Sequence, residues 1–374
     1  MSIARNKQQG TFVNFLSFIF ATTIIFANQI SADEGIEFND DFFEPKTTIG
    51  GYGELHYNST TQGDNLPTKT LDFHRFVMFY SHSWTEQWSF KAELELEHNF
   101  VQDGQGELEL EQAYINYQHS APFGFQVGVV LPSVGLLNEY HEPPLFLSVE
   151  RPDYAKVIIP TTWFGNGLAV YGRLNSFDYK LTVMEGLDAS KISLSSGIRS
   201  GRLKGYKASA DELLYNVRIN YLGLPGIRTG ISVSSTNAMG DDIQDDIPLT
   251  LVEFHTQLNQ QNFIAVIEYG SIKYDAGNLE ASNGYYADLG YNLAPLLNIS
   301  GELIPWGRYT SYNTAAMTKS GGEEVNKYSF TKWMTGVTFK PIKEVSFKMD
   351  YSVKSNALSK EETTSINLGA GYQF

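Results

Sequence analysis

The sequence predicts an all-β protein, a transmembrane antiparallel β-barrel of about 16 strands with short turns at one end and long loops at the other. Apolar residues recur at every second position in many segments, for example over 88–96 and 215–221, which is the period of a strand with two different faces. Short and long connections alternate along the chain. After residue 32 no run of about 18 apolar residues occurs, so no helix is expected to cross a bilayer, whereas alternating strands of a closed barrel can cross it.

Residues 1–32 have the order of a secretory signal peptide. Arg5 and Lys7 precede an apolar stretch, and small residues follow it up to Ala32, as in exported proteins. The alternative is an N-terminal membrane anchor, but this apolar stretch is short and interrupted by polar residues. Cleavage is expected after Ala32, with Ala27 as the second choice.

Residues 33–46 follow as an acidic segment without periodicity. This segment is too short for a domain, and we expect a periplasmic lead-in or a strap against the barrel. The barrel itself is expected to occupy residues 47–374.

The expected strands, in order, are 47–57, 70–81, 87–98, 108–118, 124–131, 164–173, 177–185, 212–221, 227–235, 249–258, 262–272, 284–293, 297–308, 329–340, 344–354 and 364–374. Short links such as 175–176 and 294–295 alternate with long ones such as 132–163 and 186–211. Short turns belong on the periplasmic side of such a barrel and long loops outside, so an even strand number places both ends of the barrel in the periplasm. Neither a β-sandwich nor a lipocalin-sized barrel explains this alternation over the whole chain.

The second and fourth strands break the alternation of apolar and polar residues. The frame shifts at Arg75 and again at Gln112 and Ala113. A β-bulge is therefore predicted in each of these strands.

The last strand ends on an aromatic residue. Ile366, Leu368, Ala370, Tyr372 and Phe374 alternate with polar or small residues up to the last position. This ending resembles the C-terminal signature of outer-membrane barrels of Gram-negative bacteria. The resemblance implies export to the outer membrane and a role for Phe374 in recognition by the barrel assembly machinery.

The long connection that begins Leu131-Pro-Ser-Val-Gly-Leu-Leu-Asn-Glu-Tyr-His-Glu-Pro-Pro and ends Trp163-Phe-Gly-Asn-Gly167, together with Leu110-Glu-Gln-Ala-Tyr-Ile-Asn-Tyr117 before it, resembles the porins grouped with the phosphate-selective porins O and P. The resemblance implies a homotrimeric channel in outer-membrane lipid and lipopolysaccharide, whose third long loop, 132–163, folds into the lumen. The chain does not show the dense arginine ladder and lysine cluster that phosphate selectivity needs. The family name is therefore not taken as evidence that phosphate is the solute of this protein.

Charged residues at inward positions divide by sign along the chain. The predicted acidic wall consists of Glu93, Glu95, Glu97, Glu107, Glu109 and Glu111, and the predicted basic wall of Arg173, Lys180, Arg218 and Arg228. Opposite walls would create a transverse field that favours small polar solutes. Two alternatives stay open: ordinary solvated lumen residues without a selective role, and Ca²⁺ held between the glutamate rows.

The long loop carries the candidate constriction residues Glu139, His141, Glu142, Glu150, Arg151, Asp153 and Lys156. Four prolines stiffen its path, although a proline-capped surface loop has the same composition. His141 and Glu142 lack a second histidine at the spacing of a zinc protease, so a solvated loop pair is expected and no metal site is predicted.

Composition excludes other classes of function. The chain has no cysteine and a formal net charge of −15, which excludes thiol chemistry and disfavours nucleic acid as a partner. No Gly-x-Ser-x-Gly motif occurs and the seven histidines are scattered, so no enzyme and no cofactor are expected. The expected function is a water-filled channel for passive diffusion of small hydrophilic solutes and ions. The alternatives are a channel specific for an anion such as phosphate or for an organic nutrient, an adhesin or receptor barrel, and an outer-membrane enzyme.

Overall fold

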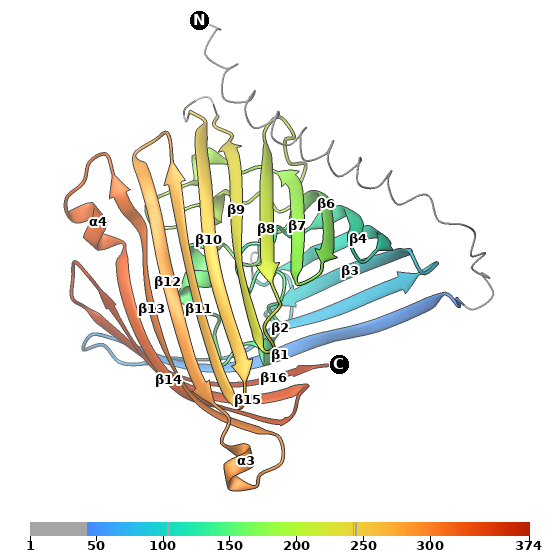
Figure 1. Cartoon of the computed structure of the whole chain (residues 1–374). Helices are drawn as coiled ribbons and strands as arrows, with labels where there is room; N and C mark the ends of the chain where they lie inside the picture. Colours follow the sequence, from blue (N-terminus) through green and yellow to red (C-terminus); the bar gives the residue numbers. More distant parts are fainter. Residues whose placement is uncertain (1–42, 103–104, 242, 244) are drawn as a thin grey trace, which may run out of the picture. The chain divides into compact units, whose positions relative to one another are not determined.

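The computed structural model describes residues 43–102, 105–241, 243 and 245–374. Sixteen strands close into one antiparallel barrel in which each strand pairs with its neighbours in sequence and β1 also pairs with β16 (Figure 1). The predicted fold class is therefore confirmed. The predicted signal peptide, residues 1–32, lies outside the described residues, as does most of the predicted lead-in, whose last residue, Lys46, already belongs to β1.

The strands are β1 (Lys46–Gln62), β2 (Thr68–Ser83), β3 (Trp88–Glu97), β4 (Leu108–Ser120), β5 (Phe123–Val130), β6 (Gly165–Leu174), β7 (Phe177–Glu185), β8 (Leu213–Tyr221), β9 (Ile227–Ala238), β10 (Ile247–Gln260), β11 (Phe263–Tyr274), β12 (Leu279–Tyr291), β13 (Glu302–Thr318), β14 (Ser329–Ile342), β15 (Val345–Asn356) and β16 (Glu362–Gln373). Short helical turns lie between them: η2 (Pro143–Leu145), α2 (Asp153–Val157), η3 (Ala189–Lys191), η4 (Arg199–Gly201), α3 (Ala294–Leu297) and α4 (Glu323–Lys327). None of the helices in the described part of the chain is long and apolar enough to cross a membrane.

Each predicted strand has a counterpart, but the thirteenth lies later than predicted. It runs over Glu302–Thr318 instead of 297–308. The predicted two-residue link at 294–295 was wrong because α3 occupies this region, and positive φ angles at Asn298 (54°) and Gly301 (87°) complete a wider turn.

The outer surface carries aromatic rings near both ends of the strands. At the end with the short turns, Tyr117 lies 4.6 Å from Trp88 and 5.4 Å from Phe125 between ring centroids. Farther toward the long loops, the rings of Tyr309 and Trp333 are 4.4 Å apart. Such aromatic girdles mark the two membrane interfaces of outer-membrane barrels.

The last strand closes the barrel on β1. The backbone N–H of Phe374 donates to the carbonyl of Gly51 at 2.9 Å, and its ring stacks on Phe76 and Tyr372. Phe374 is 59% exposed. Phe374 therefore lies on the outer face at the short-turn end of the barrel, and its role in recognition by the assembly machinery stays a prediction.

Both predicted bulges are present. Glu54 pairs with Arg75 and Leu55 pairs with Phe73, which leaves His74 as the extra residue of β2. In β4, Glu111 is the extra residue, because the register with β3 shifts between Glu93 and Leu94. A bulge turns neighbouring side chains to the same face, and here both bulges add charged groups to the lumen.

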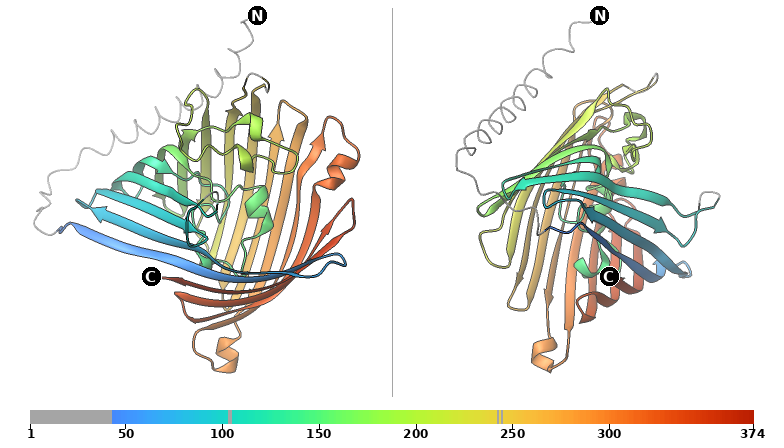
Figure 2. Two further views of the ribbon diagram at one scale, coloured as in Figure 1. Left: turned by 180° about the vertical axis from the view of Figure 1, so that it is seen from behind. Right: turned by 90° about the vertical axis from the view of Figure 1, so that its right-hand side faces the viewer.

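The interior of the barrel is partly filled by its own loops. The segment 131–164, which includes α2, lies inside the ring of strands (Figure 2). Its apolar residues form one core with inward side chains of β7 to β13; members include Tyr154, Ile158, Trp163, Leu214, Leu249, Leu251, Ile272 and Tyr286. Gly270 permits this contact, since a Cβ there would lie 2.6 Å from the Tyr154 hydroxyl oxygen.

Candidate functional site

The segment 131–164 crosses the lumen and is attached to strands on several sides. On one side, the backbone N–H groups of Gly135 and Leu136 donate to Glu253 on β10 (3.2 Å) and Glu268 on β11 (3.4 Å). On the other side, the N–H of Val149 donates to Asp350 on β15 at 2.7 Å. Inward carboxylates thus satisfy backbone donors that a loop leaves unpaired. The expectation that this loop folds into the lumen is confirmed.

Glu139 connects the loop to the predicted basic wall. Its carboxylate accepts from Lys180 Nζ at 2.7 Å and from Arg218 Nη1 at 2.5 Å, and Arg218 also contacts Asp178 at 3.2 Å. Burial alone would raise the pKa of Glu139, but the two cations lower it to about 2 overall. Two members of the basic wall are therefore paired with carboxylates, Glu139 of the loop and Asp178 of β7.

The other two members of the basic wall are differently placed. The Arg228 guanidinium lies 5.6 Å from the ring centroid of Tyr140, a loop residue. Arg173 is exposed next to the short turn after β6, where its Nε donates to the Asn175 carbonyl at 3.2 Å. Arg173 therefore occupies an inward-facing position of β6, as predicted, but its hydrogen bond is to the short turn and not to the loop.

The predicted acidic wall is not a bare row of carboxylates. Arg75 on β2 contacts Glu95 at 2.8 Å and Glu97 at 3.6 Å. Lys204, from the long connection between β7 and β8, contacts Glu107 at 2.7 Å and also Glu109. The expected separation of the two signs into opposite walls was wrong, because the bulge at His74 and the folded connection 186–212 bring cations to the acidic side.

The two remaining acidic residues, Glu93 and Glu111, face His141 of the loop. Its Nε2 lies 3.6 Å from Glu93 and 3.2 Å from Glu111, and the imidazole is 2% exposed. The expectation that His141 and Glu142 form a solvated pair was wrong for His141, because the loop buries it against β3 and β4. Glu142 is half-buried and precedes the turn η2.

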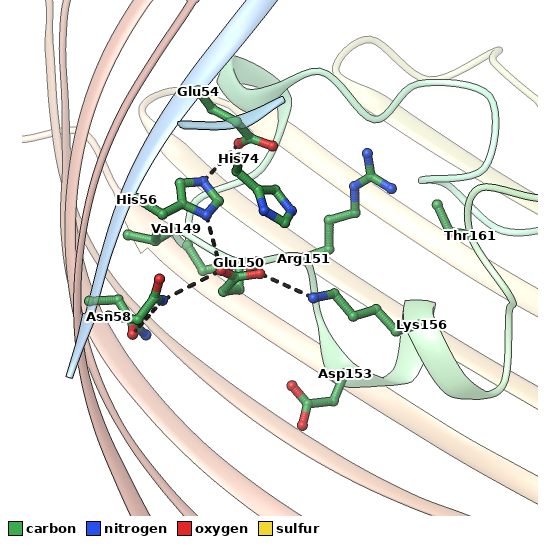
Figure 3. A network of polar contacts seen from close by, with 12 residues as sticks. Glu54, His56, Asn58, His74, Val149, Glu150, Arg151, Asp153, Lys156 and Thr161 are labelled. Atoms are coloured by element: carbon green, nitrogen blue, oxygen red, sulfur yellow. Dashed lines mark hydrogen bonds and ion pairs between the residues drawn. The ribbon is translucent and has the colours of Figure 1, made fainter. Parts of the chain in front are cut away.

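Glu150 is the centre of another network that joins the loop to β1 (Figure 3). It accepts from Lys156 at 3.1 Å and lies 3.0 Å from Nδ1 of His56, whose Nε2 is 3.0 Å from Glu54. Burial raises the pKa of Glu150, yet Lys156 and His56 lower it well below its usual value overall.

Asp153 holds the next turn of the loop to the wall. It contacts Lys332 on β14 at 2.9 Å and Lys354 on β15 at 3.1 Å. Despite its burial, these two lysines hold its pKa below the usual range. The predicted loop residues are therefore mainly paired, and their pairs fix the path of the loop.

Two cavities lie on the two sides of this loop. The outer cavity, about 310 Å³, adjoins the long-loop end of β3 and β4; its charged lining consists of Arg75, Arg151, Lys156, Arg199, Arg202, Lys204, Glu95, Glu97, Glu107, Glu109 and Glu111. The inner cavity, about 300 Å³, adjoins short turns at the other end; its charged lining consists of Arg228, Asp288, Arg308 and Lys340.

Sequence reasoning missed the cations of the connection 186–212. Arg199 donates to the carbonyls of Lys156 (2.9 Å) and Thr161 (2.8 Å), and Arg202 donates to that of Pro160 (3.0 Å). Burial and the neighbouring Arg199 lower the pKa of Arg202 to about 10, so its guanidinium remains charged at neutral pH. The spacing of Arg199, Arg202 and Lys204 in one long loop was the available signal.

Comparisons with known proteins agree with this architecture. The family model described as phosphate-selective porin O and P matches residues 50–200. An uncharacterized protein of Aquifex aeolicus (strain VF5) is 30% identical over 332 residues, which cover 81% of this chain and 74% of that protein.

Among solved structures, the outer membrane channel DcaP of Acinetobacter baumannii is similar with a TM-score of 0.60 and 12% identity, covering 88% of this chain and 97% of that chain. The anion-selective porin from Comamonas acidovorans has a TM-score of 0.59 and 11% identity, covering 88% and 100%. In-vitro folded OmpT of Vibrio cholerae, in its trimer form, has a TM-score of 0.58 and 11% identity, covering 89% and 100%. At these identities the structures establish the fold. With the family match and the relative from Aquifex, the chain belongs to the porin family described as phosphate-selective porin O and P, and it is a channel protein of the outer membrane.

Proposed function

We propose that small hydrophilic solutes and ions diffuse through this channel along a path from the outer cavity, past the loop 131–164, to the inner cavity. The observation that carries the proposal is the position of that loop, which is fastened across the lumen between two cavities of about 310 and 300 Å³ with charged linings. Cavities of this size accommodate small-molecule solutes. No bond is made or broken, so permeation depends on pore width and charge.

The charges of the two cavities favour anions. Six basic and five acidic side chains line the outer cavity, and three basic residues and one acidic residue line the inner one. Both cavities therefore carry more positive than negative side chains, and a lumen of that sign concentrates anions near the constriction. The similar Comamonas protein is described as an anion-selective porin, which agrees with this preference.

A second candidate is a channel that binds one anionic solute. Four guanidiniums, those of Arg75, Arg151, Arg199 and Arg202, line the outer cavity, and guanidinium groups bind carboxylates and phosphates through paired hydrogen bonds. The sequence alone did not indicate this grouping. A binding site in the path would make transport saturable, whereas simple diffusion gives a flux proportional to concentration.

Planar-bilayer recording tests both candidates. The purified protein is expected to give conductance steps. In a KCl gradient, the sign of its zero-current potential should indicate that chloride permeates more readily than potassium. A conductance linear in salt supports the diffusion channel, and a conductance that saturates with inorganic phosphate or a small carboxylate supports the specific channel. Absence of conductance steps from a folded barrel would refute both.

The proposed working form is a homotrimer in outer-membrane lipid and lipopolysaccharide, delivered by a cleaved signal peptide and the barrel assembly machinery. The likeness to OmpT in its trimer form supports the assembly state. We include the absence of catalysis in this proposal, since the family and the fold are those of a channel. Mass measurement in a mild detergent tests the trimer, and a panel of ester and peptide substrates tests for hydrolysis.

A further inference from the structure

Three buried side chains meet where the loop touches the wall between β3 and β4. They are His141 of the loop, Glu93 of β3 and the bulge residue Glu111 of β4, with exposed fractions of 2%, 1% and 1%. His141 Nε2 lies 3.2 Å from Glu111 Oε2 and 3.6 Å from Glu93 Oε1. One ligand atom from each residue can be chosen so that all three lie within 4.8 Å of one another.

The three facing atoms have no hydrogen-bond partner among the described residues. Buried polar atoms are normally paired, and a separation of 3.6 Å is too long for a hydrogen bond. A protonated imidazole has a single N–H at Nε2, so it can serve only one of the two carboxylates. A protonated His141 would therefore leave at least one of the two buried carboxylate oxygens without a hydrogen-bond donor.

The same separations fit a shared metal ion. A tetrahedral zinc ion has bonds of about 2.0–2.2 Å to histidine nitrogen and carboxylate oxygen, which places neighbouring ligand atoms roughly 3.3–3.5 Å apart. The observed distances of 3.2 and 3.6 Å lie on either side of that range. Small movements of the side chains are enough to coordinate an ion.

The residues around the cluster hold the ligands in place. His141 Nδ1 lies 3.3 Å from the Asn138 carbonyl, and donation of the Nδ1 proton to it leaves the Nε2 lone pair free. The Gln112 amide donates to the second oxygen of Glu93. Asn138 itself is fixed, because its side chain donates to the Pro132 carbonyl at 2.8 Å and accepts from the backbone N–H of Trp163 at 2.8 Å. Metal-binding histidines and carboxylates usually have such outer partners.

We propose that His141, Glu93 and Glu111 bind one divalent transition-metal ion of the zinc class, which staples the constriction loop to the barrel wall. An imidazole nitrogen favours zinc over calcium or magnesium, which prefer all-oxygen sites. Two carboxylates neutralise the two positive charges of the ion. Glu111 also lines the outer cavity, so an ion can enter from that side and keep a water molecule as its fourth ligand.

Zinc binding to the folded, chelator-treated barrel tests this site. We expect one tightly bound zinc per chain by titration and elemental analysis, and Co²⁺ in its place should give the absorption of a tetrahedral N/O site. His141→Gln should remove this equivalent, and Glu111→Gln should weaken zinc by more than about tenfold. Folding of each variant is checked by heat-dependent gel mobility and by conductance.

The matched control is His98→Gln. His98 and His74 contact Asp72 near the outer end of β2, and His98 has a side chain that is 45% exposed. This group is one of two competing candidate sites among the described residues; the other consists of His56, His74 and Glu150. The control should keep the tight zinc equivalent. The proposal is overturned if wild-type protein binds no zinc, if folded His141→Gln retains the same tight equivalent, or if His98→Gln loses it.

Discussion

Glu139→Gln should loosen the constriction loop and destabilise the barrel. The change removes a carboxylate that pairs with Lys180 at 2.7 Å and Arg218 at 2.5 Å and leaves both cations buried without this partner. The pKa of Glu139 is lowered from 4.5 to about 2, a difference that corresponds to about 3 kcal/mol of stability at neutral pH. Loss of one member of a buried ion pair costs a similar amount.

The assay is urea unfolding in lipid vesicles at pH 7, followed by tryptophan fluorescence. The matched control is Glu142→Gln, three residues along the same loop, which removes the same charge from a half-buried side chain for which no ion pair is described. It should change the free energy of unfolding by no more than about 0.5 kcal/mol. Because the loop narrows the path, Glu139→Gln should also raise the single-channel conductance.

The pH dependence gives a second check. The pKa of Glu139 is depressed in the folded state, so its contribution to stability is fully present above the unfolded value near 4.5 and is lost as the pH falls through about 2. The difference between wild type and Glu139→Gln should therefore shrink over this window. Equal losses of stability for Glu139→Gln and Glu142→Gln, or a difference that does not change between pH 5 and 2, would refute the reasoning.

Three further perturbations test the topology, the assembly signal and the field in the pore. Replacing Phe374 with Ser, or deleting it, should lower the yield of folded, heat-modifiable barrel in the outer membrane, and unchanged assembly in a host with few periplasmic chaperones would contradict its predicted role. An epitope tag within 240–246 should be labelled on intact cells, while a tag within 222–226 should be reached only after the outer membrane is broken; the reverse pattern would invert the barrel. Replacing Arg202 and Lys204 with Glu should shift the zero-current potential toward cations, less at 1 M than at 0.1 M salt because the Debye length falls from ~10 to ~3 Å; a potential that stays fixed at low salt would place these residues away from the ion path.

The alternation of residues along a strand predicted which charged side chains point into the barrel, but not which groups they contact. Glu95 and Arg218 point to the interior, as the alternation predicted. It could not show that Arg75 lies 2.8 Å from Glu95 or that Glu139 lies 2.5 Å from Arg218. A carboxylate next to a guanidinium has little remaining field at a distance. Selectivity therefore depends on the excess of charges in each cavity more than on the rows of charge along single strands.

The sequence by itself determined the barrel, the number of strands and both bulges, whereas the entry of the loop into the lumen was implied only by the resemblance to the porin family. These features depend on local properties, since the period of two, the turn residues and a break in alternation are each contained in a few neighbouring positions. The thirteenth strand was misplaced because its turn depends on unusual backbone angles at Asn298 and Gly301, which residue type indicates only weakly.

Tertiary structure decided which charged groups meet. Lys204 reaches Glu107 across 97 residues of chain, and His141 meets Glu93 and Glu111 only because the loop packs its apolar residues against β7 to β13. The path of a long loop is set by the sum of many weak contacts with distant strands, none of which is visible in the loop's own sequence. The charge of each residue was therefore known from the sequence, whereas its partner, and with it the local field and ligand geometry, required the fold.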